Sequence, residues 1–290
     1  MRQNPWLDRR VMSYAHQGGA NEAPSSTLHA IENAIRLGCN AIELDIHMTS
    51  DGVLVACHDP TLDRTTGTTG AIADHTYAQL AELDNAYWFV EGQDVQHDRD
   101  VSEYTLRGRA PADHGYGIAT LDEIIDITEG IVLNLDIKKT APDVPPYEIA
   151  LADLLRRRRR VDDVIVASFL DSASAAFKAY APDIATSAGT NAVAEFFRAV
   201  RAGAPVPEAV AEHVALQVPA RFQDMVVVDQ TFVEAAHHAG LAVHVWTINE
   251  RDEMEQLCDL GVDGIISDAP SVMVDVLDAR RLAWRGSPPA

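Results

Sequence analysis

The chain has 290 residues and a net charge of −21, with 44 acidic against 23 basic side chains, and 47% of its residues are hydrophobic. This length and composition fit a globular protein that folds as one large α/β barrel or as two small domains. The excess of negative charge repels nucleic acid and anionic membrane surfaces, so it excludes both as standing partners. The sequence leaves the oligomeric state open.

The cysteines and the N-terminus bear on the cellular compartment. Cys39, Cys57 and Cys258 are odd in number and form no C-x-x-C pair, which is typical of reduced, packed thiols in a cytosolic protein. The first ten residues contain no apolar core of the kind that a signal peptide or an anchor needs. No run approaches the ~18 apolar residues of a membrane span. We therefore expect a cytoplasmic protein without stable membrane association.

The first predicted strand begins near Val11 and ends at His16. The Gln-Gly-Gly turn after it is flexible and exposes the imidazole together with nearby backbone N–H groups. A helix is predicted over residues 28–37, with Ser26 or Thr27 as its N-cap and a glycine closing it. A second strand follows at once. This β–α–β unit is typical of a parallel sheet.

The second strand, from Ala41, has two faces of different character. Its apolar and polar side chains alternate: Ile42, Leu44 and Ile46 against Glu43, Asp45 and His47. Buried carboxylates on one face repel each other and lose hydration, and a divalent cation between them removes both penalties. Oxygen ligands of this kind indicate Mg²⁺ or Ca²⁺. A turn and a predicted hairpin strand over 53–57 then bring His58 to the same place.

Residues 61–117 interrupt the regular alternation. They hold a short predicted helix over 74–83 and the aromatic run Tyr87, Trp88 and Phe89. Loops this long are uncommon inside a domain unless they are functional. We predict an insertion or lid over the site, with a variable surface excursion as the alternative. The aromatic run favours a packed lid or pocket wall, and a small satellite core is equally consistent with it.

The β–α alternation resumes after residue 117. A strand over 131–137 places Asn134, Asp136 and Lys138 on one face. Further helices are predicted over 121–128, 147–159, 172–180, 191–202, 207–213, 230–239 and 251–260. With the hairpin set aside, eight barrel strands begin near Val11, Ala41, Ile131, Val164, Ile184, Met225, Ala242 and Asp263.

Eight β–α units in this length predict a single-domain TIM (β/α)8 barrel over 1–290, with a frayed tail at 277–290. Such barrels work at the C-terminal ends of their strands. The candidate residues lie at or near such ends: His16, Glu43, Asp45, Asp136, Lys138, Trp246 and Asp268. Three carboxylates, two histidines and a lysine there predict a metal-assisted site for a phosphate-bearing substrate.

At these residues the chain resembles the glycerophosphodiester phosphodiesterase family. The matching segments fall in the family's order and span about residues 11–270: A-H-Q-G-G at 15–19, I-E-L-D-I at 42–46, T-S-D-G-V-L-V-A-C-H-D-P-T-L-D-R-T-T-G at 49–67, A-T-L-D-E-I at 119–124, D-I-K at 136–138, V-H-V-W-T-I-N at 243–249 and G-V-D-G-I-I-S-D-A-P at 261–270. The H-D-P-T-L-D-R-T-T-G block is specific, and the two last segments corroborate it.

The resemblance implies the hydrolysis of a glycerophosphodiester to sn-glycerol 3-phosphate and an alcohol. It implies these roles: His16 and His58 as the general acid/base pair, Glu43, Asp45 and Asp136 as ligands of one divalent cation, Mg²⁺ or Ca²⁺, and Gln17, Lys138 and Trp246 as substrate-binding residues. Lys138 resembles the lysine on the phosphate side. Trp246 would form the wall against the alcohol, or it would only fill the barrel.

The chain departs from the family's pattern in three places. The family has Arg where this chain has Gln17, Glu where it has Ser25, and Glu where it has Asp136. A shorter carboxylate at 136 can still ligate, with altered reach. One positive and one negative charge are absent together at 17 and 25, and we hypothesise that these positions contact each other and changed as a pair. Gln17 can still donate an amide N–H to phosphate, more weakly than a charged group.

Two other functions stay open on the sequence. A lysophospholipase D-like enzyme would act on a single-chain lipid and needs an apolar groove, for which Tyr87, Trp88 and Phe89 are candidates. A barrel that binds phosphodiesters with little turnover would account for the three departures. The presence of both histidines, two strand carboxylates and Lys138 argues against this last alternative.

Overall fold

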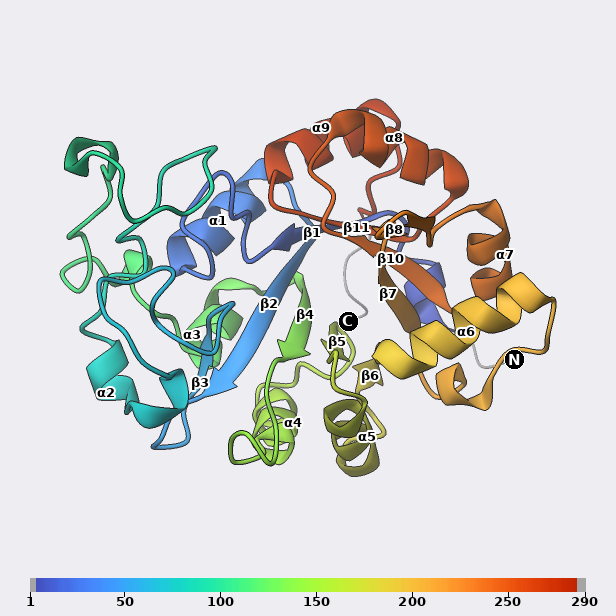
Figure 1. The fold of residues 1–290 in the computed structure, drawn as a ribbon, viewed down its shortest axis with the longest axis horizontal. Helices are drawn as coiled ribbons and strands as arrows, with labels where there is room; N and C mark the ends of the chain where they lie inside the picture. The colour runs from blue at the N-terminus through green and yellow to red at the C-terminus, as the bar shows by residue number, and fades with distance from the viewer. Residues whose placement is uncertain (1–3, 286–290) are drawn as a thin grey trace.

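The computed structural model describes residues 4–285, which form a barrel of parallel strands surrounded by helices (Figure 1). The barrel strands are β1 (Met12–His16), β2 (Ala41–Met48), β4 (Val132–Ile137), β5 (Val164–Ala167), β6 (Ala185–Thr186), β7 (Ala215–Pro219), β10 (Ala242–Trp246) and β11 (Gly264–Ser267). They pair in the order β6-β5-β4-β2-β1-β11-β10-β7, and a parallel bridge from Ser187 to Ala215 brings the two ends together. The predicted TIM (β/α)8 barrel is confirmed.

A helix follows each barrel strand and packs on the outside of the barrel. These helices are α1 (Leu28–Leu37), α3 (Leu121–Ile127), α4 (Glu148–Arg157), α5 (Asp171–Tyr180), α6 (Thr190–Ala202), α7 (Gln230–His238), α8 (Arg251–Leu260) and α9 (Pro270–Ala279). Helix α1 has the predicted bounds because the Thr27 hydroxyl accepts from the Ala30 N–H and Gly38 ends the helix at φ +106°. Aliphatic side chains of strands and helices form the main core between the two layers.

The predicted barrel strand beginning at Met225 is wrong. The barrel strand is β7, and Met225–Val226 (β9) instead forms a short antiparallel hairpin with Arg221–Phe222 (β8) outside the barrel. The predicted helix over 207–213 is only the turn η5 (Glu208–Val210). The cause is the sequence A-L-Q-V-P of β7, in which Gln217 points into the barrel and bonds to Asn134, so the strand lacks a clear apolar run.

Residues 61–117 lie beside the barrel next to α1 (Figure 1). Before this segment, β3 (Leu54–Ala56) pairs with β2 and forms the predicted hairpin. The segment 61–117 itself contains four short helical turns: η2 (Ile72–Asp74), α2 (Tyr77–Leu80), η3 (Val101–Glu103) and η4 (His114–Tyr116). The helix predicted over 74–83 is thus a single turn. The segment is tied to the β1–α1 loop, because the Gly92 N–H donates to the Asn21 carbonyl at 2.7 Å and the Asn85 amide donates to the Ser25 carbonyl at 3.0 Å.

The aromatic run of this segment is held by the segment itself. The Arg107 guanidinium lies 4.2 Å from the ring centre of Tyr87, 4.5 Å from that of Trp88 and 4.1 Å from that of Tyr104. The Trp88 indole N–H donates to the Thr66 carbonyl at 2.7 Å. A desolvated cation over aromatic faces contributes about 2 kcal/mol in favourable cases. Tyr87 and Trp88 therefore act in packing the insertion.

The C-terminal segment packs at the N-terminal end of the barrel strands, where it bonds to Val11 just before β1. Helix α9 continues to Ala279 with Leu277 buried, the Val11 N–H donates to the Leu282 carbonyl at 2.7 Å, and the Trp284 N–H donates back to the Val11 carbonyl at 3.1 Å. The expected fraying after residue 276 is therefore wrong for 277–285, and 286–290 lie outside the described residues. Within 4–285, no helix has the length and apolar character needed to cross a bilayer.

The barrel interior contains a fully buried imidazole, that of His244 on β10. It packs against Tyr14, with ring centres 5.0 Å apart, and a Cβ at Gly264 would lie 2.8 Å from it. Glycine is therefore required at this position of β11 by close packing. Burial lowers the pKa of His244 from 6.5 to about 4, since the low-dielectric interior disfavours the charged ring.

We expect the free energy of unfolding to fall as the pH is lowered from 6.5 to about 4. The unfolded chain binds a proton at His244 in this range and the folded chain does not, so this ring lowers stability by about 3 kcal/mol at the acid end. Urea unfolding of the wild type and of His244→Gln at pH 7 and pH 4.5 measures this. The pH dependence should be smaller in His244→Gln and unchanged in the exposed control His238→Gln, and equal slopes in all three would contradict the prediction.

Candidate active site

The register of three neighbouring strands brings the predicted residues together. His16 at the end of β1 pairs with Glu43 on β2, and Asp45 on β2 pairs with Asp136 on β4. Side chains at paired positions of parallel strands point to the same side of the sheet. The four residues therefore form two adjacent rows at the C-terminal ends of β1, β2 and β4, which is the end where TIM barrels carry their active sites.

The turn after β1 has a conformation that glycine alone adopts easily. Gly18 and Gly19 have φ of +83° and +100°, and a Cβ on them would lie 2.8 Å from the Ala30 Cβ and 2.5 Å from the Pro270 Cγ, respectively. The turn is thus pressed between the first residues of α1 and α9. This close packing fixes the direction in which His16 leaves the strand.

His16 is held by a carboxylate that the sequence did not assign to it. Its Nδ1 lies 2.6 Å from Asp268 Oδ1, and the Asn249 amide donates to Asp268 Oδ2 at 3.1 Å. Its Nε2 lies 3.7 Å from Glu43 Oε2. Burial lowers the pKa of His16, but Glu43 and the hydrogen bond with Asp268 outweigh burial and raise it to about 9.

His58 has a matching arrangement on the other side. Its Nδ1 lies 2.6 Å from Asp59 Oδ1, and Arg64 Nε donates to Asp59 Oδ2 at 2.8 Å. The hydrogen bond with His58 lowers the pKa of Asp59. The rings of His58 and His16 are 6.0 Å apart and perpendicular. Each imidazole thus has a carboxylate on Nδ1, which leaves Nε2 for proton transfer.

Three carboxylates lie buried beside the histidines. Burial and the charge of Asp45 raise the pKa of Glu43 to about 8, and burial raises the pKa of Asp136 to about 6. Lys138 Nζ lies 2.8 Å from Asp45 Oδ1 and 3.4 Å from Asp136 Oδ2, and these carboxylates raise the pKa of Lys138 against the effect of burial. One lysine therefore neutralises only part of the negative charge at this place.

The donor set fits a hard divalent cation. In residues 4–285, no three His, Cys, Asp or Glu side chains already stand in an ion-coordinating arrangement, since Lys138 occupies the space between two of the carboxylates. Yet Asp45 Oδ2 and Asp136 Oδ1 are buried without a hydrogen-bond partner among the described residues. Buried carboxylate oxygens that lack partners are costly, and a cation such as Mg²⁺ or Ca²⁺ satisfies them.

The remaining predicted residues lie around this cluster. Trp246 ends β10, and its ring meets Phe169, which follows β5, with centres 5.4 Å apart. The Gln17 amide nitrogen lies 3.2 Å from His16 Nε2, and the Gln17 carbonyl accepts from the Ser26 N–H at 2.7 Å. The segments that carry positions 17 and 25 thus touch through their backbones, and the hypothesis that the two positions changed as a pair stays a prediction.

Several side chains around the site are not predicted by the sequence patterns, namely Asp59, Arg64, Phe169 and Asn249, and no pattern predicts the contact between Asp268 and His16. The signals were weak but present. Asp59 and Arg64 fall within the H-D-P-T-L-D-R-T-T-G block, Asn249 follows W-T-I, and Phe169-Leu170 are exposed apolar residues after a buried strand. None of these patterns states a contact, because each partner is distant in the chain or separated by a turn.

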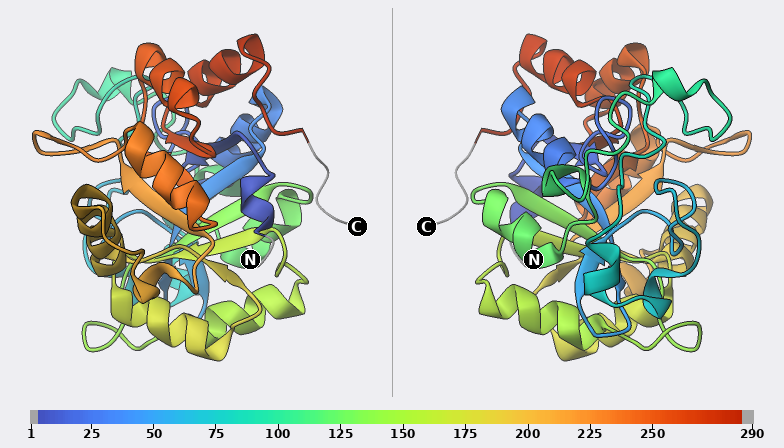
Figure 2. Two further views of the ribbon diagram at one scale, coloured as in Figure 1. Left: turned by 90° about the vertical axis from the view of Figure 1, so that its right-hand side faces the viewer. Right: turned by 90° about the vertical axis from the view of Figure 1, so that its left-hand side faces the viewer.

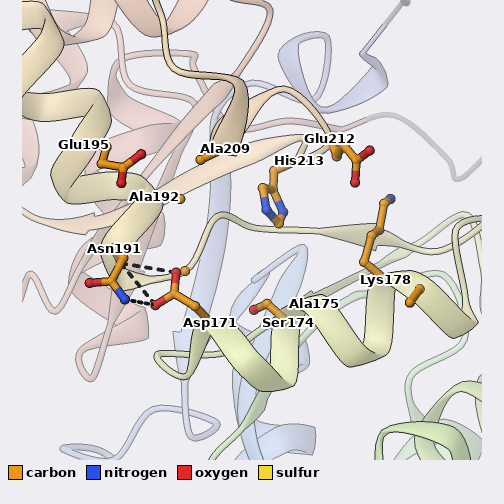
Figure 3. Close-up of a pocket in the computed structure, with 12 residues that line it drawn as sticks. Asp171, Ser174, Ala175, Lys178, Asn191, Ala192, Glu195, Ala209, Glu212 and His213 are labelled. Carbon is orange, nitrogen blue, oxygen red and sulfur yellow. Dashed lines mark hydrogen bonds between the residues drawn. The ribbon is translucent and has the colours of Figure 1, made fainter.

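A hollow of about 410 Å³ lies elsewhere, between α5 and α6 on the outside of the barrel (Figure 3). It is lined by small and charged side chains, among them Asp171, Lys178, Glu195, Glu212 and His213. Asp171 accepts hydrogen bonds from Asn191 there, and His213 bonds to Thr186. None of the predicted site residues lines it, so it is separate from the cluster at the barrel mouth.

Comparison with known proteins identifies the family. Residues 16–272 match the model of the glycerophosphoryl diester phosphodiesterase family. A Bacillus subtilis glycerophosphodiester phosphodiesterase is 28% identical over 270 residues, or 91% of this chain and 85% of that protein. Another, from Caldanaerobacter subterraneus subsp. tengcongensis, is 27% identical over 274 residues, or 92% of this chain and 98% of that protein.

A solved structure agrees with these relatives. An Oleispira antarctica phosphodiesterase in complex with the product sn-glycerol-3-phosphate shares 25% identity at a TM-score of 0.70, and the match covers 94% of this chain and 99% of that one. The family model, the relatives and the fold agree over nearly the whole length, and they agree with the motifs that surround His16 and His58. The chain belongs to the glycerophosphoryl diester phosphodiesterase family.

Proposed function

We propose that this protein hydrolyses glycerophosphodiesters to sn-glycerol 3-phosphate and an alcohol, with one divalent cation, Mg²⁺ or Ca²⁺, at the barrel mouth. One observation supports the proposal most: two histidines, each with a carboxylate on Nδ1 and with ring centres 6.0 Å apart, lie beside a buried cluster of three carboxylates. The relatives named above support the reaction, and the product bound to the Oleispira antarctica enzyme supports the product.

The histidines move the protons. The nucleophile, which is water or the substrate's own neighbouring hydroxyl, attacks phosphorus, and one of His16 and His58 accepts its proton. The other histidine donates a proton to the alkoxide that leaves as the phosphorus–oxygen bond to the alcohol breaks. Asp268 and Asp59 accept from the Nδ1–H of their histidine and so keep its Nε2 directed to the mouth. Gln17 donates to a phosphate oxygen through its amide.

The metal and Lys138 would stabilise the negative charge on the phosphate oxygens. Glu43, Asp45 and Asp136 would hold the cation, which supplies Lewis-acid stabilisation of charge on the phosphate oxygens when bound. The ammonium of Lys138, which touches two of these carboxylates here, would turn to the phosphate side. Trp246 and Phe169 form the wall against the alcohol.

The products of glycerophosphocholine hydrolysis test this function. The purified protein with Mg²⁺ or Ca²⁺ should release sn-glycerol 3-phosphate and choline in equal amounts, measured with glycerol 3-phosphate dehydrogenase and choline oxidase. Glycerophosphoethanolamine serves as a second substrate with a different alcohol. Release of glycerol and phosphocholine, or no release from either substrate with either metal, would contradict the proposal.

A second candidate, action on single-chain lysolipids, is favoured by apolar side chains around the mouth. Phe169 and Phe222, which follow the ends of β5 and β7, are 53% and 59% exposed. Leu170 beside the first and Met225 on the β8–β9 hairpin are also exposed. The hairpin projects from the barrel (Figure 2). This apolar rim (Phe169, Leu170, Phe222 and Met225), rather than Tyr87 and Trp88, is where an acyl chain would lie.

Substrate preference measures whether the rim binds a chain. If it does, Phe222→Ser and Met225→Ser should each lower kcat/KM about ten- to thirtyfold for lysophosphatidylcholine below its micellar concentration, because burial of a phenylalanine or methionine side chain is worth about 2 kcal/mol. Activity on glycerophosphocholine should change little. Ile149→Ser on α4, where Ile149 is 56% exposed, is the matched control. Equal effects on both substrates would rule out a chain-binding rim.

A further inference from the structure

A line of polar contacts joins the two histidines across the mouth. From one end, His58 Nδ1 lies 2.6 Å from Asp59 Oδ1, and Arg64 Nε donates to Asp59 Oδ2 at 2.8 Å. From the same guanidinium, Nη2 donates to Gln17 Oε1 at 3.3 Å. The Gln17 amide nitrogen then lies 3.2 Å from His16 Nε2 and 3.5 Å from its Nδ1, so it meets the imidazole between the two ring nitrogens. Arg64 is the midpoint of this line, and neither the sequence pattern nor the comparisons give it a role.

We propose that Arg64 is a positioning residue for both histidines: it orients His58 through Asp59 and orients the Gln17 amide beside His16. The proposal rests on the function proposed above. It needs a side chain that donates in two directions from a rigid plane, which a guanidinium does and an ammonium does not. The two contacts come from different nitrogens, Nε and Nη2, of one planar group.

The contact with Arg64 decides which way the Gln17 amide faces. An arginine only donates, so the oxygen of Gln17 must face Arg64, and its NH₂ group must then face His16 and the mouth. The residue has little freedom to turn elsewhere. Gln17 is 4% exposed, its φ is +53°, and its backbone N–H donates to the Glu43 carbonyl at 2.9 Å.

This geometry gives a reason for glutamine at position 17, where the family has arginine. Glutamine both accepts from Arg64 and donates into the mouth, whereas an arginine at 17 cannot accept and would set a second guanidinium against the first. Like charges repel unless an anion lies between them. The family carries the arginine of the H-D-P-T-L-D-R-T-T-G block together with arginine at 17, but it has a glutamate at 25, whereas this chain has Ser25 and no carboxylate at that position. Introducing the family's residue alone should therefore impair the site.

A set of four variants tests the proposal through kcat and KM on glycerophosphocholine. Arg64→Lys keeps the charge but not the fork, and we expect kcat to fall on the order of ten- to a hundredfold with KM within about twofold, as for a misplaced catalytic group. Gln17→Arg should lower kcat similarly. Gln17→Arg with Arg64→Gln, which removes the repulsion, should recover activity relative to Gln17→Arg. The matched control is Arg99→Lys, also in the insertion and bonded to Asp94 and Glu103.

Wild-type kcat in Arg64→Lys, or Gln17→Arg as active as the wild type, would overturn the proposal. A readout independent of activity separates its failure from that of the proposed function. Imidazole ¹⁵N chemical shifts should report one Nδ1–H tautomer of His58 in the wild type and in Arg99→Lys, and a mixture in Arg64→Lys. A changed tautomer in an inactive protein would uphold the positioning role while refuting the reaction, and an unchanged tautomer would overturn the positioning role itself.

Discussion

Replacing His58 by Ala is expected to lower kcat for glycerophosphocholine about 10²- to 10⁴-fold, because the reaction loses the group that transfers one of its two protons. KM should change little, since His58 contacts Asp59 and the mouth rather than the alcohol wall. The side chain is 35% exposed, so the fold should tolerate the change. Steady-state kinetics and the thermal unfolding midpoint measure both effects.

The exposed His238 on α7 supplies the control for this substitution. His238→Ala should keep wild-type kinetics, and His16→Ala should lose activity as His58→Ala does. The double variant His16→Ala/His58→Ala should be only slightly less active than either single variant, because residues that act as a unit are not additive. If His58→Ala kept more than about a tenth of wild-type kcat, acid/base catalysis by this pair would be wrong.

The second large effect is expected at the carboxylate cluster. Asp45→Asn should weaken Mg²⁺ or Ca²⁺ binding by about a hundredfold or more, since changes to the outer-shell partners of metal ligands already cost 10- to 100-fold and Asp45 is proposed as a direct ligand. Asp45 and Asp136, which are paired in register, each have a buried carboxylate oxygen without a hydrogen-bond partner among the described residues, which is the reason to expect a cation at this place. Calorimetric titration of the purified protein with each metal measures the affinity.

Asp143→Asn provides the comparison, since Asp143 is an exposed acid near β4 that pairs only with Lys139 among the described residues. Its metal affinity should equal that of the wild type. Asp136→Asn should behave like Asp45→Asn, because the two carboxylates are paired in register and share Lys138. Wild-type metal affinity in Asp45→Asn and Asp136→Asn would place any cation elsewhere.

Much of the fold and half of the site follow from local sequence patterns. The alternation along residues 42–47 predicted which side chains of β2 face inward, and the parallel register then carried Asp136 beside Asp45. The helix at 28–37 was predicted correctly because its cap and its closing glycine are both explicit in the sequence. These features depend on neighbours in the chain, so one sequence suffices to predict them.

The errors and omissions depend on contacts between distant residues. Strand β7 was not predicted because Gln217 interrupts its apolar run. The hydrogen bond that allows this glutamine to be buried is made to Asn134, which is 83 residues away and lies across the barrel. The carboxylate on His16 comes from Asp268, 252 residues along the chain. Arg64 and Gln17 are brought together only by the turns that follow β1 and β3. The periodicity of apolar residues along the chain does not predict contacts between residues that are so far apart in sequence.

The proposed mechanism depends most on the divalent cation, and activity before and after metal removal tests this dependence directly. Protein stripped with EDTA and exchanged into metal-free buffer should release no sn-glycerol 3-phosphate from glycerophosphocholine. Addition of Mg²⁺ or Ca²⁺ should restore release in the wild type and leave Asp45→Asn inactive. Full activity of the stripped wild-type protein without added metal would contradict the carboxylate cluster as a metal site and leave the histidines and Lys138 as the whole of the catalytic machinery.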